Sequence, residues 1–126
     1  MPKSNDVIVN FTDVQKSYDG ETLVIRNLNL DIFRGEFLTL LGPSGSGKTT
    51  SLMMLAGFET PSHGIISLEG KPLNRVPPEK RDIGMVFQNY ALFPHMTVAE
   101  NIGFALKQRA VQKTEISESV ARALDI

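Results

Sequence analysis

The sequence of 126 residues lacks cysteine, long apolar stretches and an excess of either charge. Without cysteine, disulfide bonds, thiolate metal sites and a cysteine nucleophile are all excluded. A membrane-spanning helix needs about 18 consecutive apolar residues, and the sequence contains no such run. The 13 Lys and Arg side chains against 14 Asp and Glu give a net charge of -1, which argues against a surface that wraps nucleic acid. We therefore expect no nucleic-acid partner, and any phosphate recognition must be local.

Length and composition fit one globular domain. Hydrophobic residues make up 41% and charged residues 21% of the chain, close to the averages of soluble domains. The first six residues are polar and precede only a short apolar run. We therefore do not expect a signal peptide.

Apolar patterning predicts strands in the first part of the chain. Alternating apolar residues predict half-buried strands at residues 7–11 and 28–32, with a turn at 18–21. The almost continuous apolar run at residues 37–41 predicts a strand buried on both faces. Residues 83–87 predict another short apolar strand.

Helical spacing follows the glycine-rich segment. Residues 48–56 predict a helix that packs through Leu52, Leu55 and Ala56 and stops at Gly57. The predicted order of elements is therefore a buried strand, a glycine-rich loop and a helix. The loop between the strand and the helix contains the most informative motif of the chain.

The remaining elements are predicted by turn and capping residues. A strand is expected at residues 65–69 and a proline-containing surface connection at residues 70–78. Thr97 and Glu100 have the spacing of a capping box, which predicts a helix after Thr97. A last helix is expected to start near Lys113.

The segment from Gly42 to Thr49, GPSGSGKT, matches the P-loop pattern G-x-x-x-x-G-K-[ST]. Glycines let the backbone direct several N–H groups at one anion, and the start of the following helix adds its positive dipole end. Lys48 would supply a charge for the β- and γ-phosphates, and the Thr49 hydroxyl would hold magnesium. The alternative is a glycine-rich turn with a chance Lys-Thr pair. The predicted strand and helix on either side favour nucleotide binding.

Three blocks of the sequence resemble a known family. GPSGSGKTT, LMMLAGFETPSHGIISLEGKPL and RDIGMVFQNYALFPHMTVAENI are similar to the first part of the nucleotide-binding domain of ABC transporters, and the resemblance covers about residues 7–126. It implies an α/β fold, a P-loop NTPase of the ABC type, with N-terminal antiparallel strands and the first part of a parallel core sheet with helices. Residues 1–126 would then be the N-terminal part of one ATPase domain, an incomplete domain.

The resemblance also implies roles for single residues. Gln88 falls in the Q-loop, where the family's glutamine touches magnesium and the attacking water and senses the membrane subunit; the alternative is an exposed loop glutamine. Tyr18 stands where the family places an aromatic residue, in the A-loop, that stacks on adenine; the alternative is a turn tyrosine that packs on its own hairpin. Ser44 and Thr50 would add hydroxyl contacts to the phosphates, or could be ordinary capping residues.

The residues of the expected site have three roles: catalysis, magnesium binding and ATP binding. The residues expected to act in catalysis are Lys48 and Gln88, and those expected to hold magnesium are Thr49 and Gln88. The residues expected to bind ATP are Tyr18, Gly42, Pro43, Ser44, Gly45, Ser46, Gly47, Lys48, Thr49 and Thr50.

Three motifs of the family's ATPase site are missing from these 126 residues. They are an LSGGQ-type signature, a Walker B strand that ends in Asp-Glu, and the switch histidine. Because phosphoryl transfer depends on electrostatics around magnesium and the attacking water, we expect this chain to bind ATP and not to hydrolyse it alone. We interpret the sequence as a truncated gene product or a piece of a longer protein.

The segment PPEKRDIGMVFQNYALFPHMTVAENIGFAL is similar to importers of polyamines, ferric iron and sugars, with polyamine uptake closest. That similarity implies an energy-coupling ATPase with ATP and Mg²⁺ as cofactors. It also implies permease subunits, a second ATPase subunit and, indirectly, a periplasmic binding protein as partners, at the cytoplasmic face of the inner membrane. The alternative is a nucleotide-binding interaction module without turnover. A different P-loop enzyme, such as a small-molecule kinase, would lack the VFQ block.

Overall fold

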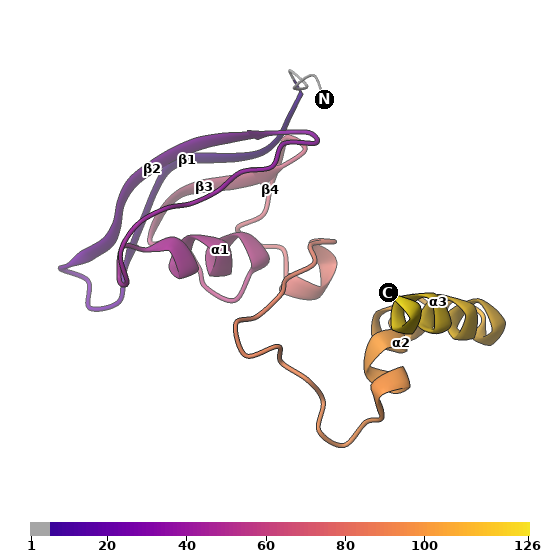
Figure 1. Ribbon diagram of the computed structural model, residues 1–126. Helices are drawn as coiled ribbons and strands as arrows, with labels where there is room; N and C mark the ends of the chain where they lie inside the picture. The colour runs from indigo at the N-terminus through magenta and orange to yellow at the C-terminus, as the bar shows by residue number, and fades with distance from the viewer. Residues whose placement is uncertain (1–5) are drawn as a thin grey trace. The chain divides into compact units, whose positions relative to one another are not determined.

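Alternating apolar residues build an antiparallel sheet in the computed structural model, which describes residues 6–126. The strands are β1 (Val7–Ser17), β2 (Leu23–Phe33), β3 (His63–Leu68) and the short β4 (Lys71–Pro72). Their order in the sheet is β2-β1-β3-β4, and every neighbouring pair is antiparallel (Figure 1). The predicted strands at residues 7–11, 28–32 and 65–69 are confirmed, although β1 and β2 are longer than expected.

A bulge in β1 changes which residues face the core. Val9 and Phe11 are buried at odd positions, whereas the next buried residue is Val14. The register with β2 shifts between Phe11 and Val14, and Asp13 has a φ of 49°. A Cβ on Gly64 of β3 would lie 2.3 Å from the Asp13 carbonyl oxygen, so only glycine lets β3 approach the bulge this closely.

Helix α1 (Lys48–Ala56) packs against this sheet and completes the core. Its bounds and its end at Gly57 confirm the prediction. The core consists of Val9, Phe11, Val14, Ile25, Met54, Ile66 and Leu73. The predicted inward face was wrong at Leu52, which is 49% exposed, because the buried residues of α1 are Ser51, Met54 and Ala56. A helix with apolar residues around most of its circumference does not indicate from sequence which side will be covered.

The predicted strands at residues 37–41 and 83–87 are absent, and the described residues contain no parallel pair of strands. Neither segment belongs to a strand, and Phe37, Leu41 and Val86 are 94%, 89% and 91% exposed. A strand of a parallel sheet needs neighbours on its edges and cover on its faces. Among residues 6–126 the only sheet is the four-stranded antiparallel one, so these segments have no strand partner.

The chain divides into two compact units between Met85 and Val86. The first contains the sheet, α1 and a 3-10 helix, η1 (Pro78–Lys80). The second contains α2 (Val98–Gln108) and α3 (Lys113–Asp125). No helix within residues 6–126 combines the length and apolarity needed to cross a membrane.

The two helices of the second unit pack at a glycine. Gly103 of α2 is buried, and a Cβ there would lie 3.0 Å from Ile116 and 3.4 Å from Val120 of α3. The capping box before α2 is confirmed: the Glu100 N–H donates to the Thr97 hydroxyl at 3.1 Å, and the Thr97 N–H donates to the Glu100 carboxylate at 3.1 Å.

Candidate nucleotide-binding site

The glycine-rich loop leads directly into the first turn of α1, which starts at Lys48. Gly47 precedes the helix with a φ of 94°, and it has no side chain that could cap the first turn. The first turn also carries no acidic residue. The N–H groups at the start of α1 are therefore free of a side-chain acceptor at the cap, which suits an anion.

Lys48 folds back over the loop. Its ammonium group donates to the carbonyl oxygen of Gly42, to that of Pro43 at 2.9 Å and to the Ser46 hydroxyl at 3.3 Å. The positive charge is thus held within the loop by neutral acceptors. Phosphate oxygens are stronger acceptors for an ammonium group than carbonyl oxygens, so a bound triphosphate could replace them.

Two glycines of the loop lie close to neighbouring side chains, and at Gly47 the backbone conformation also favours glycine. A Cβ on Gly42 would lie 2.6 Å from the Ser46 Oγ. A Cβ on Gly47 would lie 2.4 Å from the Ile25 side chain of β2, and the positive φ adds strain for any other residue. Gly47 therefore also lets α1 begin close against the sheet.

The hydroxyl groups around the loop differ in burial. Ser44 and Thr49 are exposed and Thr50 is half-buried. Ser51 is buried, and its hydroxyl donates to the Gly47 carbonyl oxygen at 2.8 Å. Thr49 is thus the more exposed of the two threonines in the first turn of α1. Ser51 instead ties the first turn of the helix to the loop.

A cavity of about 480 Å³ adjoins the loop. It lies between residues 24–28 of β2 and Leu40 and Leu41, and its wall includes Ser46, Gly47, Lys48 and Ser51. A partly apolar recess therefore lies beside the loop.

Tyr18 follows β1 directly and is 59% exposed. The turn after it is organised by Asp19, whose carboxylate accepts from the N–H groups of Glu21 and Thr22 at 2.8 and 2.7 Å and from the Ser17 hydroxyl at 3.0 Å. These bonds, those from the two backbone N–H groups first, lower the pKa of Asp19 from 3.8 to about 2. The turn therefore presents Tyr18 on an ordered backbone.

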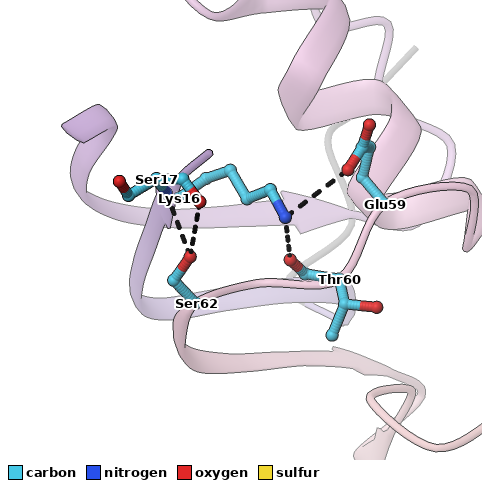
Figure 2. A network of polar contacts seen from close by, with 5 residues as sticks. All are labelled: Lys16, Ser17, Glu59, Thr60 and Ser62. Atoms are coloured by element: carbon cyan, nitrogen blue, oxygen red, sulfur yellow. Dashed lines mark hydrogen bonds and ion pairs between the residues drawn. The ribbon is translucent and has the colours of Figure 1, made fainter. Parts of the chain in front are cut away.

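A polar network joins the residues before Tyr18 to the segment after α1 (Figure 2). Lys16 donates to the Thr60 carbonyl oxygen at 2.7 Å, and its Nζ lies 3.4 Å from the Glu59 carboxylate. The Ser17 N–H donates to the Ser62 hydroxyl at 3.0 Å, and that hydroxyl donates to the Ser17 carbonyl oxygen at 3.3 Å.

Gln88 lies in the second unit, at the start of a turn over residues 88–91, and its side chain is exposed. The N–H of Tyr90 in this turn donates to the Phe87 carbonyl oxygen at 3.0 Å. The structure thus brings the residues of the P-loop together in the first unit, and places Gln88 in the other unit. The role of Gln88 stays a prediction.

Sequence reasoning missed two residues that support the site. Arg81 is 7% exposed and donates to four backbone carbonyls, those of Leu73, Val76, Met54 and Leu55. The charged, proline-rich segment around it gave no sign of burial. Lys16 gave no local sign of its role either, because its partners, the Thr60 carbonyl oxygen and the Glu59 carboxylate, lie more than 40 residues further along the chain.

Relatives of this chain are import ATP-binding proteins by name. The spermidine/putrescine import ATP-binding protein PotA of Oleidesulfovibrio alaskensis is 55% identical over 119 residues, which cover 94% of this chain and 32% of that protein. PotA of Thermobifida fusca is 48% identical over 129 residues, which cover 98% of this chain and 34% of that protein. The chain spans about a third of the length of these curated relatives.

Solved structures share the fold. The dimeric structure of a bacterial ABC transporter cassette matches with a TM-score of 0.80 and 31% identity, over 94% of this chain and 55% of that chain. The cbiO1 protein from Clostridium perfringens, part of the ABC transporter complex cbiONQ, matches with a TM-score of 0.79 and 30% identity, over 96% of this chain and 50% of that chain. The described fold is therefore part of a cassette domain.

The family described as ABC transporter matches residues 25–125. This range includes the whole P-loop, the helix that follows it and the segment with Gln88. Because the match covers most of the sequence and the fold agrees with it, the chain belongs to the ABC transporter family, as part of its ATP-binding domain.

Proposed function

We propose that this chain binds MgATP at residues 42–50 and is the N-terminal part of the energy-coupling ATPase subunit of a polyamine importer. The observation that carries the proposal is the complete P-loop, which leads into a helix without a side-chain cap and holds the Lys48 ammonium group inside the loop. The names and identities of the PotA relatives support the polyamine substrate.

Each proposed ligand contact follows from the chemistry of the residue. Lys48 exchanges its carbonyl acceptors for the β- and γ-phosphates, and the loop N–H groups bind the same oxygens. Thr49 contributes its hydroxyl to Mg²⁺, a hard cation that takes oxygen ligands, and the Gln88 amide oxygen is a second neutral ligand of that kind. Bound Mg²⁺ neutralises charge on the phosphates. Ser44 and Thr50 add hydroxyl donors, and Tyr18 stacks on the base.

The proposed partners follow from the same relatives. A permease would dock near the segment that contains Gln88, and a second ATPase copy would complete the ATP site; a dimeric cassette among the similar structures supports the dimer. A periplasmic binding protein would take part indirectly. The subunit would lie on the cytoplasmic face of the inner membrane as a peripheral protein.

Substitution of Lys48 tests the binding site. Lys48→Ala should weaken MgATP binding by at least about tenfold, because a hydrogen bond to a charged group contributes about 1.5–3 kcal/mol. Lys71→Ala, which removes an exposed lysine from β4, is the matched control and should bind like the wild type. Equilibrium dialysis with labelled ATP measures both. Equal binding by wild type and Lys48→Ala would rule out the P-loop as the site.

The second candidate is a nucleotide-binding module without turnover, which needs only the P-loop that these 126 residues contain. Phosphate release distinguishes the two. We expect this chain alone to bind MgATP without releasing phosphate, and a version extended with the signature and Walker B segments of a relative to hydrolyse it. Turnover by the 126-residue chain that Lys48→Ala abolishes would contradict the expected dependence on those segments. An extended version that binds but never turns over would favour the module.

A further inference from the structure

We infer that Lys16 is a positioning residue that holds the Tyr18 ring as a platform for the base and ties that platform to the helix of the phosphate site. The inference rests on the proposed function, since it concerns how the same site would hold adenine. Lys16 lies outside the P-loop, and its contacts are with the segment after α1 and with the Tyr18 ring.

Lys16 is held firmly at its charged end. Its side chain is only 12% exposed, although it is a lysine on a small sheet. The ammonium group donates to the Thr60 carbonyl oxygen at 2.7 Å and lies 3.4 Å from the Glu59 carboxylate. A lysine without such partners would place its ammonium group in water. These two acceptors therefore define one position for the charge.

That position is over the Tyr18 ring. The Lys16 Nζ lies 5.0 Å from the ring centroid, within the range of a cation–π contact. The contact restrains a tyrosine that is otherwise largely exposed, and it occupies one face of the ring. The opposite face stays available for stacking, and a ring that is already ordered loses less conformational entropy when a base binds.

The acceptors of Lys16 lie in the segment directly after α1. The Glu59 N–H donates to the Met53 carbonyl oxygen in the last turn of the helix at 3.3 Å, which ties this segment to the helix. Ser17 and Ser62 form a second connection between the same two segments (Figure 2). The phosphate loop thus precedes α1, and the segment that holds Lys16 follows it. This arrangement fixes the base platform relative to the phosphate site through one rigid element.

The test compares two ligands that share the phosphate site and differ in the base. MgATP and magnesium tripolyphosphate are each titrated by calorimetry against the 126-residue chain, and the ratio of their affinities reports the contribution of the nucleoside. The variants are Lys16→Met, which keeps the length of the side chain and removes its charge, and Lys16→Arg, which keeps a cation for the ring. Tyr18→Ala gives the ratio of the two affinities for a chain without the aromatic ring. Lys71→Met on β4 is the control for loss of an exposed lysine.

Lys16→Met should weaken MgATP binding by about two- to fivefold, as expected of a cation–π contact, and leave tripolyphosphate binding unchanged. Lys16→Arg should restore most of the loss. Tyr18→Ala should weaken MgATP by about tenfold or more, as expected of a lost stacking contact, again without an effect on tripolyphosphate.

Three results would overturn the inference. The first is that Lys16→Met has the same ratio of MgATP affinity to tripolyphosphate affinity as the wild type, while Tyr18→Ala lowers this ratio. The second is an equal loss for both ligands in Lys16→Met, which would indicate a general effect of charge or folding. The third is an unchanged ratio in Tyr18→Ala, which would remove the platform itself. Failure of the wild type to bind either ligand would instead refute the proposed function.

Discussion

Asp19 shows how one exposed side chain organises the turn that presents Tyr18. Its carboxylate accepts three hydrogen bonds, from the N–H groups of Glu21 and Thr22 and from the Ser17 hydroxyl. Charge-assisted bonds of this kind favour the ionised form. They lower the pKa of Asp19 to about 2, from an ordinary value of 3.8.

The lowered pKa predicts the pH dependence of this turn. Because the folded pKa lies below the unfolded one, the stabilisation by Asp19 is fully present above pH 3.8 and is lost as the pH falls through about 2. A carboxyl-carbon NMR titration should find Asp19 still ionised where ordinary aspartates are half protonated. Asp19→Asn keeps an acceptor oxygen and removes the ionisable group. The NMR signals of its turn should therefore not change with pH in this range. A midpoint for Asp19 at or above 3.8 would contradict the assignment.

At the scale of elements, Arg81 joins the end of α1 to the chain after β3. Its guanidinium donates to the Met54 and Leu55 carbonyls at 3.0 and 3.1 Å and to the Leu73 and Val76 carbonyls at 2.9 Å each. Burial lowers the pKa of Arg81 from its usual value. These bonds satisfy carbonyls at the end of a helix, where a cation is also favoured by the helix dipole.

Removal of this guanidinium should destabilise the first unit. We expect Arg81→Met to lower the free energy of unfolding by about 2–4 kcal/mol, because buried carbonyls lose their donors. Arg75→Met, at an exposed arginine of the same connection, should stay within about 0.5 kcal/mol of the wild type. Urea unfolding followed by circular dichroism measures both. Similar midpoints for the two variants would show that Arg81 does not join these elements.

For the whole molecule, the informative feature is the set of apolar side chains that remain in water. Phe37 and Leu41 before the P-loop are 94% and 89% exposed, in the segment that the sequence predicts as a buried strand. In the family that the chain resembles, the Walker B strand would lie beside this segment. Exposed apolar residues of this kind favour association between chains.

We therefore expect the 126-residue chain to be marginally stable or to associate. Full burial of one large apolar side chain contributes about 1.5–3 kcal/mol, against a total of about 5–15 kcal/mol for a domain. The double variant Phe37→Ser and Leu41→Ser should reduce association of this chain without lowering its melting temperature. In a version extended with the Walker B segment, the same double variant should lower the melting temperature. Size-exclusion chromatography and thermal unfolding test both effects, and a monodisperse, sharply unfolding wild type would contradict the expectation.

Local patterns were enough for much of the fold and for the core of the candidate site. The bounds of α1, the capping box at Thr97 and the two long strands follow from neighbours within a few residues, which the sequence contains directly. The P-loop belongs to this class as well, since its glycines, Lys48 and the helix start are contiguous in the chain.

Only the tertiary structure decided features that depend on distant partners. Residues 37–41 are apolar enough for a buried strand, yet a strand forms only where other strands supply hydrogen bonds and cover. Arg81 looks like a surface residue until the carbonyls of α1 and the connection after β3 surround it. Lys16 finds its place over Tyr18 because the segment after α1, more than 40 residues away, returns to the end of β1. The sequence by itself thus determined the elements and the phosphate loop, because their signals are local, while burial and support of the site depended on contacts that only folding brings together.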